Sequence, residues 1–257
     1  MHADDTPFYR RRGILAGVLA MAAIVAATSA LGVWQLDRAK QKAALQAVRD
    51  RAQAQAPLLL SGGDSLPRTP QEAGALDARK IAVEGTFLPA RAVFLDNRTR
   101  DGVAGFEVLM PIRPPGGDAV VLVMRGWVAG DPRDRNRVPT VSTPPGPQRV
   151  EGLAMAELPQ PLVLAASDAP GPQDRIWQHF SFDRYAAWSG LAVAPVVVRQ
   201  TVEPALADGL NRQWNQPGTG VDRHRAYAFQ WFSMSALALG FGIVLVVRAR
   251  RSGGDAG

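Results

Sequence analysis

One stretch near the C-terminal end constrains this chain more than any other, because the 22 residues 226–247 carry no charge. At about 1.5 Å of rise per residue, a helix of that length crosses a hydrocarbon core of roughly 30 Å. Three arginines, Arg248, Arg250 and Arg251, follow the stretch. It therefore predicts a transmembrane helix whose far end is held at a membrane surface by positive charge.

A second apolar run of 24 uncharged residues, 13–36, lies near the N-terminal end and follows three arginines at 10–12. A cleaved secretory signal is the alternative. The run is longer than the roughly 7–15 residues of a signal core and ends in Trp-Gln-Leu rather than at a small-residue cleavage site. A twin-arginine export signal fits only loosely. We expect an uncleaved helix, in which Gly13 and Gly17 form a small-xxx-small pair for close packing.

Charge and cysteine content exclude several functions. The net charge is +6, and the six arginines that flank the two apolar runs match it, which argues for membrane anchoring rather than nucleic-acid binding. The absence of cysteine excludes disulfide exchange, thiolate metal sites, iron–sulfur ligation and cysteine nucleophiles. Basic flanks on both helices place both termini in the cytoplasm.

The expected fold is a membrane α+β protein. Two transmembrane helices flank a β-rich extracytoplasmic domain, antiparallel and barrel- or sandwich-like, with a short helix. The expected boundaries are a cytoplasmic tail at 1–12, a transmembrane helix at 13–36, a helical extension at 37–56, the β-rich domain at 57–225, a transmembrane helix at 226–247 and a cytoplasmic tail at 248–257.

The middle of the chain has the β-branched and aromatic runs of strands, separated by turn residues. Four runs, at 80–88, 91–99, 105–112 and 119–128, predict an antiparallel meander, and further strands are expected at 149–158 and 193–202. Ser181 is expected to cap a short helix at 182–190. The extension should break at Pro57, residues 60–76 should form a flexible connection, and 168–172 should be a Pro- and Gly-rich break.

Three aromatic side chains mark the beginning of the second helix. His224, Tyr227 and Trp231 are spaced i, i+3 and i+7, which predicts one helical face at the membrane–water interface. An imidazole there can ligate a metal. The alternatives are an aromatic belt of interfacial anchors and a solvated histidine. Trp34 and Gln35 of the first helix are expected at the same level.

Six different short motifs follow one another along the chain. They are LGVWQLDRAKQKAAL at 31–45, VEGTF at 83–87, Gly105-Phe106 leading to Pro111, RGWV at 125–128, Trp177 with Asp183, and HRAYAFQW at 224–231. In this order they resemble the Surfeit locus protein 1 family of cytochrome c oxidase assembly factors. The resemblance covers nearly the whole chain.

This resemblance implies a membrane-bound chaperone that helps deliver or insert haem a, bound transiently, into subunit I of the oxidase. It implies His224 as an axial ligand of the haem iron. Tyr227 and Trp231 would pack on the haem, and Arg223 and Arg225 would lie near its propionates, with interfacial snorkelling as the alternative for the two arginines.

Five further residues from the shared motifs are expected to have structural or partner-contact roles: Trp34, Gln35, Arg125, Gly126 and Trp127. For Arg125, Gly126 and Trp127, a purely structural role is the stronger alternative to a direct functional one. It would involve a bulge or close backbone approach at Gly126 and a core contact at Trp127. His179, beside Trp177, is expected to be a packed residue outside the site.

The implied partners are oxidase subunit I, membrane lipid and, as a further candidate, haem a synthase, without nucleic acid. The expected location is the bacterial cytoplasmic (inner) membrane, crossed twice, with the main domain in the periplasm. The short segment before residue 13 leaves no room for a mitochondrial transit peptide, which favours a bacterial protein.

Three other classes compete with a haem chaperone. A scaffold could stabilise subunit I without touching haem. A receptor would need an output domain, and only ten residues follow Val247. An enzyme is not expected, because the chain has no G-x-S-x-G elbow, H-E-x-x-H motif or phosphate loop.

Overall fold

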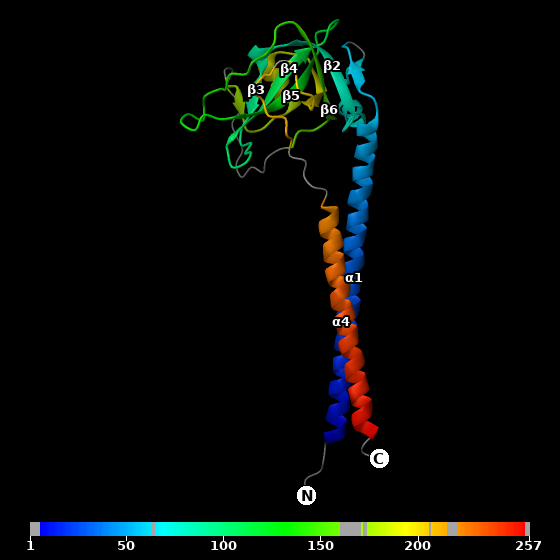
Figure 1. The fold of residues 1–257 in the computed structure, drawn as a ribbon. Helices are drawn as coiled ribbons and strands as arrows, with labels where there is room; N and C mark the ends of the chain where they lie inside the picture. The colour runs from blue at the N-terminus through cyan, green and yellow to red at the C-terminus, as the bar shows by residue number, and fades with distance from the viewer. Residues whose placement is uncertain are drawn as a thin grey trace. The chain divides into compact units, whose positions relative to one another are not determined.

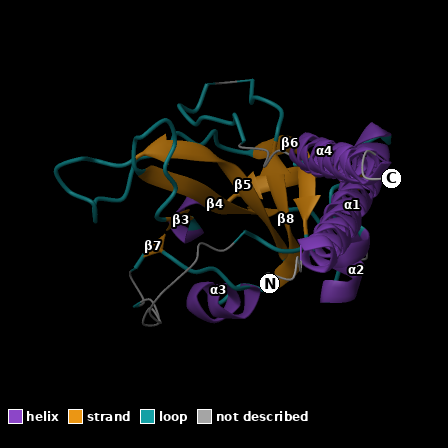
Figure 2. Cartoon of the chain, turned by 90° about the horizontal axis from the view of Figure 1, so that it is seen from below, coloured by secondary structure: helices purple, strands orange, loops and turns teal. Residues whose placement is uncertain are grey.

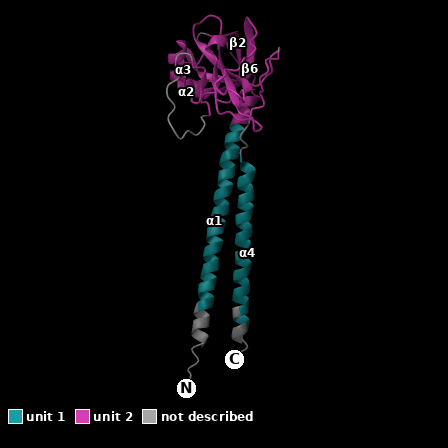
Figure 3. Ribbon diagram, turned by 90° about the vertical axis from the view of Figure 1, so that its left-hand side faces the viewer, with its two compact units in different colours: residues 1–48, 216–257 teal, residues 49–215 magenta. Residues whose placement is uncertain are grey.

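The structure is a computed structural model, and it describes residues 6–62, 65–159, 171, 174–205, 207–214 and 220–254, without the side chains of 6–12, 249 and 252–254. The chain forms two compact units (Figure 3). One comprises Met1–Val48 with Gln216–Gly257, and the other is Arg49–Asn215. The break expected at 168–172 lies outside the described residues except for Gly171.

Two long antiparallel helices make up the first unit (Figure 1). Helix α1 spans Thr6–Ala54 and α4 spans Val221–Gly254. Both are long and apolar enough to cross a membrane. Helix α1 runs without interruption through the apolar run and the extension, and it ends before Pro57, whose ring cannot be accommodated in a helix interior.

The two helices meet along a regular seam. Buried or half-buried positions recur at spacings of three and four, at 21, 25, 28, 32, 35 and 39 in α1 and at 224, 228, 231, 235, 238 and 242 in α4. This is the heptad spacing of helices that pack side by side in a coiled coil. Most side chains outside the seam are exposed apolar groups, as expected for a surface that faces lipid.

Polar and small residues hold the seam together. The hydroxyls of Ser29 and Ser235 are 2.8 Å apart, and Ser235 also donates to the backbone oxygen of Val25 at 3.4 Å. In hydrocarbon, such interhelical hydrogen bonds are worth about 0.6–2 kcal/mol. They fix which turn of α1 lies beside which turn of α4.

The expected close packing at Gly13 and Gly17 is not where the helices approach most closely. A Cβ added at Gly13 would meet no described atom within 4 Å, and one at Gly17 would only touch Leu245 at 4.0 Å. At Gly32, in contrast, an added Cβ would lie 2.8 Å from the ring of Phe232. Gly32 is therefore the small residue that makes room for an aromatic ring of the partner helix.

The second unit is built on one eight-stranded sheet, in the order β1-β2-β6-β8-β5-β4-β3-β7. An extra pairing of β2 with β4, through Thr86 with Arg113 and Phe87 with Ile112, closes five of these strands into a barrel. The strands are β1 Leu58–Leu60, β2 Lys80–Phe87, β3 Val93–Leu95, β4 Gly105–Arg113, β5 Val120–Ala129, β6 Pro147–Met155, β7 Ile176–Trp177 and β8 Val193–Gln200.

The strand connections differ from the expected meander. Strands β3, β4 and β5 are consecutive antiparallel neighbours, as predicted. Strand β2, however, pairs with β6 rather than β3, and β8 lies between β6 and β5, parallel to β5. Figure 2 draws the strands of the sheet in orange. The pattern of apolar residues is the same for either neighbour, so it does not reveal which strands pair.

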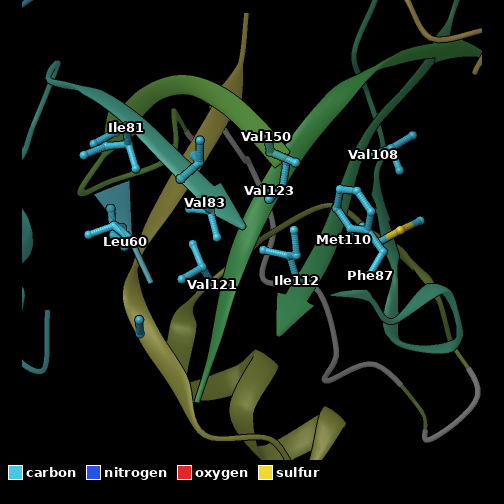
Figure 4. Close-up of a cluster of buried hydrophobic side chains, with 14 of the residues drawn as sticks. Leu60, Ile81, Val83, Phe87, Val108, Met110, Ile112, Val121, Val123 and Val150 are labelled. Atoms are coloured by element: carbon cyan, nitrogen blue, oxygen red, sulfur yellow. The ribbon is translucent and has the colours of Figure 1, made fainter. Parts of the chain in front are cut away.

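Side chains that alternate along the strands fill the barrel. Figure 4 shows Ile81, Val83, Ile112, Val121 and Val123 converging in this core, and each is fully buried. Burial of one such side chain contributes about 1.5–3 kcal/mol before entropy is counted. A second cluster around Tyr185 and Trp177 packs on the other face of β4, β5 and β8.

Two short helices lie between strands. Helix α3, Phe182–Ser189, begins where predicted, and the side chain of Ser181 accepts a hydrogen bond from the backbone of Arg184 at 3.2 Å. Helix α2, Pro70–Ala75, and the 3-10 turn Pro89–Arg91 were not predicted. The expectation of a structureless connection at 60–76 was therefore wrong, because residues 70–75 are helical.

Candidate functional site

The predicted haem-facing residues lie in the first three turns of α4. The helix begins after Gly220, whose φ of 66° lies in the left-handed region open to glycine, and the backbone of His224 donates to the Gly220 oxygen at 3.1 Å. Asp222 lies in the first turn, where a carboxylate is favoured by the helix dipole. His224 therefore occupies a defined position one turn into the helix.

His224 contacts the other helix directly. Its Nδ1 is 2.7 Å from Oε1 of Gln35 in α1, and both side chains are half-buried. An amide oxygen only accepts hydrogen bonds, so in this arrangement Nδ1 carries the proton. The lone pair of the neutral ring is then on Nε2, which has no protein partner among the described residues.

Trp231 and Tyr227 differ in their environments. Trp231 is half-buried at a seam position, as is His224, and Ala228 lies between them at 1% exposure. Tyr227 is 48% exposed and lies beside the seam. The predicted spacing therefore brings His224 and Trp231 onto one half-buried stripe, with Tyr227 at its edge.

The remaining predicted residues of this end are mostly at the surface. Arg223 and Arg225 are exposed, and Arg225 lies 3.5 Å from Asp222, in an ion pair that water screens. Trp34 is 50% exposed, with the guanidinium of Arg38 5.7 Å from its ring centre. Because the side chains of Arg223 and Arg225 are exposed, they can contact a ligand or the membrane surface.

Arg125 is a buried residue of the barrel unit, only 2% exposed. Its guanidinium donates to Asp208 at 2.8 Å, to Thr143 at 2.7 Å and to the Ser142 oxygen at 3.1 Å, and lies 4.7 Å from the ring centre of Phe87. Burial lowers the pKa of Arg125, and the carboxylate of Asp208 opposes that shift. Its contacts are internal to the domain.

Gly126 and Trp127 fasten the segment 210–212 to β5. A Cβ at Gly126 would lie 2.7 Å from that of Leu210, so this approach requires glycine. The backbone of Trp127 exchanges two hydrogen bonds of 2.8 Å with Asn211, and its indole donates to the Arg98 oxygen at 2.6 Å. These contacts account for the Arg-Gly-Trp motif within the domain and match the close backbone approach expected at Gly126. Trp127 is half-buried and belongs to neither hydrophobic cluster, so the core contact expected of it is not seen.

Sequence reasoning missed the charged partners of this motif. Asp208 and Arg212 have side chains that are 2% exposed, and Arg212 bonds both Asp208 and, at 2.6 Å, Glu203. They lie in an irregular segment before α4, where charged residues are ordinarily solvated. No local pattern marks them as buried, because their partner Arg125 is 83 residues from Asp208.

The described residues contain no cluster of three or more histidine, aspartate or glutamate side chains that could hold a metal ion. His179 is half-buried between the buried Trp177 and Phe180, in keeping with a packed residue. Among the predicted site residues, His224 alone is a type that commonly ligates iron.

Comparison with known proteins agrees with this architecture. The chain is 26% identical over 248 residues to a SURF1-like protein of Monosiga brevicollis, which covers 92% of this chain and 88% of that protein. It is 25% identical over 229 residues to a SURF1-like protein of Drosophila melanogaster, with 83% and 72% covered. The sequence profile of the SURF1 family matches residues 22–236, which include the barrel, most of α1 and the first half of α4. The chain therefore belongs to the SURF1 family, a family of oxidase-assembly-related proteins.

Proposed function

We propose that this chain is a haem a chaperone for the assembly of a haem–copper cytochrome c oxidase, holding haem a at the beginning of α4 for delivery to subunit I. The observation that carries the proposal is the hydrogen bond between His224 Nδ1 and Gln35. Histidines that ligate metals usually donate their second ring N–H to a protein oxygen, which fixes the tautomer and raises the basicity of the other nitrogen.

The neighbouring residues fit a haem as well. Nε2 of His224 would supply the axial bond to iron. Trp231, half-buried one seam position along, and Tyr227, at the edge, offer apolar and aromatic surface. Arg223 and Arg225 provide positive charge within reach of propionates. When bound, haem a is cargo for the oxidase, and the residues of this chain hold and orient it.

The location follows the same proposal. In this proposal the protein lies in a bacterial cytoplasmic membrane, with both termini inside and the barrel in the periplasm. The two apolar helices and their basic flanks support this topology. Subunit I is the proposed client, and haem a synthase a candidate donor. Haem a would then be handed over at the outer surface of the membrane.

The test is an absorption spectrum of the detergent-purified protein from cells that make haem a, beside His224→Ala. We expect the wild type to carry haem a and His224→Ala to lose it or show a shifted spectrum. Ser233→Ala is the matched control on the same helix and should keep the haem, because the Ser233 hydroxyl donates to the backbone oxygen of Phe229 at 2.9 Å and is not part of the proposed haem site.

A scaffold without haem is the second candidate. The contact of His224 with Gln35 also explains the histidine as a link between two helices, with no ligand. If neither the wild type nor His224→Ala carries haem while oxidase assembly still depends on the chain, the protein is a scaffold rather than a haem chaperone. Haem retained in full by His224→Ala would remove His224 from the proposal.

A further inference from the structure

A pocket of about 240 Å³ lies in the barrel unit, on the face of the sheet opposite the barrel core. Strands β4, β5 and β8 contribute Glu107, Met124 and Arg199 to its wall. Their chain neighbours Val108, Val123 and Val198 point into the core, and side chains alternate along a strand. All residues that line the pocket belong to this one unit.

The pocket is positively charged. Arg98, Arg100 and Arg199 line it beside one carboxylate, Glu107, which leaves a net charge of +2 from three positive groups and one negative group. Burial raises the pKa of Glu107, and the charges of the three arginines oppose that shift. An anion that enters would therefore meet excess positive charge that water screens poorly.

The three arginines are not equally committed to protein partners. Arg98 pairs with Glu107 at 3.0 Å and donates to the Pro159 oxygen at 3.1 Å. Arg100 donates to the side chain of Asn211. Arg98 and Arg199 each have a buried Nε without a hydrogen-bond partner among the described residues. Of the three guanidiniums, however, only that of Arg199 makes no hydrogen bond or ion pair with a described residue. A buried donor without an acceptor is costly, so Arg199 is the group in this pocket that a ligand would satisfy.

The rest of the wall is apolar and aromatic. Met124, Met155, Trp127 and Trp214 line the pocket. The indole of Trp214 is held by a hydrogen bond of 2.7 Å to the Gln200 oxygen, and the guanidinium of Arg199 lies 5.9 Å from its ring centre. One positive fork beside flat apolar surface suits a molecule with an anionic head and an apolar body.

We propose that this pocket binds a small organic carboxylate, with its carboxylate on Arg199 and its apolar body against Trp214 and the two methionines. A carboxylate matches the planar fork of a guanidinium with two parallel hydrogen bonds. The volume is below the roughly 300 Å³ at which pockets begin to enclose drug-sized ligands. The ligand is therefore a small acid, and the site is separate from the proposed haem site on α4.

The experiment uses the full chain in neutral detergent, purified from cells that make no haem a, so that its outcome is independent of the proposed haem binding. Phenylacetate is titrated by calorimetry, beside phenylacetamide, which has the same shape without the charge, and inorganic phosphate, which has charge without an apolar body. We expect saturable binding of phenylacetate that is at least about tenfold tighter than that of either control.

Variants locate the binding. Arg199→Met should weaken phenylacetate binding at least about tenfold, and Arg199→Lys, which keeps the charge but loses the fork, should fall between. Arg113→Met, an exposed arginine at the end of β4, is the matched control and should bind as the wild type does. If Arg199→Met fails to fold, the lysine variant carries the test.

Three results would overturn the proposal. They are no saturable binding of phenylacetate by the folded wild type, equal binding by the wild type and the folded Arg199 variants, and phosphate binding at least as tight as that of phenylacetate. The last result would reassign the pocket to inorganic anions.

Discussion

The guanidinium of Arg125 and the carboxylate of Asp208 are 2.8 Å apart, and each side chain is only 2% exposed. Arg212, equally buried, bonds the same carboxylate oxygen. One buried carboxylate therefore serves two buried guanidiniums, and together they join β5 to the segment that precedes α4. A charge cluster of this kind is stable only while every member keeps its partner.

Asp208→Asn should destabilise the protein severely, because it leaves Arg125 buried without a countercharge and Arg212 with only the exposed carboxylate of Glu203. Removing one partner of a buried pair costs about 3–5 kcal/mol. At about 2–4 °C per kcal/mol for a domain of this size, Tm in neutral detergent should fall by about 6–20 °C. The control is Glu203→Gln. The side chain of Glu203 is 69% exposed, so this substitution should cost no more than about 1 kcal/mol of stability. Equal losses in both variants would contradict this account.

Acid should weaken the same cluster. Burial would raise the pKa of Asp208, but hydrogen bonds from Arg212 and the Leu210 backbone, with the charges of Arg212 and Arg125, hold it below its ordinary value of 3.8. Such a carboxylate stabilises the fold above its unfolded-state pKa, and that contribution is lost as pH falls through the lower folded-state pKa. The Tm difference between wild type and Asp208→Asn should be constant above pH 5 and shrink below pH 3.8. A difference that grows on acidification would be inconsistent with this.

Gly126→Ala should displace the segment 210–212 from β5, since its Cβ would lie 2.7 Å from that of Leu210 and 3.1 Å from the Asn211 oxygen. Overpacking of this kind costs about 1–3 kcal/mol. Gly74→Ala in α2 is the control, because its Cβ meets no described atom within 4 Å and alanine favours a helix by up to about 1 kcal/mol. Thermal unfolding of both variants checks this, and an unchanged Tm for Gly126→Ala would show that the strand relaxes freely.

Gln35→Leu should weaken haem a binding by about 10–100-fold if His224 is the ligand, because the ring loses the acceptor that orients it. Gln35→Glu keeps an acceptor for the ring N–H and should retain haem with a lower reduction potential, because a carboxylate makes the stronger, charge-assisted hydrogen bond. Ser29→Ala removes the hydrogen bond between Ser29 and Ser235 of the two helices and should leave both properties unchanged. A haem titration and a redox titration provide the measurements. An equal loss in Ser29→Ala would assign the effect to helix packing.

The parts of the fold that depend on local pattern were predictable. The uncharged runs predicted both long helices, Pro57 predicted the end of α1, and Ser181 predicted the cap of α3. Helix α2 had a readable signal that was outweighed by nearby glycines and prolines. Thr69 caps the backbone of Glu72, and the Glu72 carboxylate accepts from the backbone of Arg68.

For the candidate site, the sequence predicted only the positions of its residues along α4. The spacing of His224 and Trp231 placed them on one stripe, but the bond to Gln35 depends on the register between two helices, which Ser29 and Ser235 help to set. The Arg-Gly-Trp motif identified Arg125, but no sequence pattern identified Asp208 as its partner. Long-range electrostatic pairs leave no periodic trace.

The position of β8 has a consequence for how the chain is made. This strand is the last in the sequence, yet it lies between β6 and β5 in the sheet. During synthesis, the edges of β5 and β6 that pair with β8 stay unpaired until residue 200 has left the ribosome. Such late, non-local pairing is slow and leaves the chain prone to aggregation. A premature stop anywhere before residue 193 would remove α4 and the strand that joins the two halves of the barrel, so no shortened product of that kind retains a closed domain.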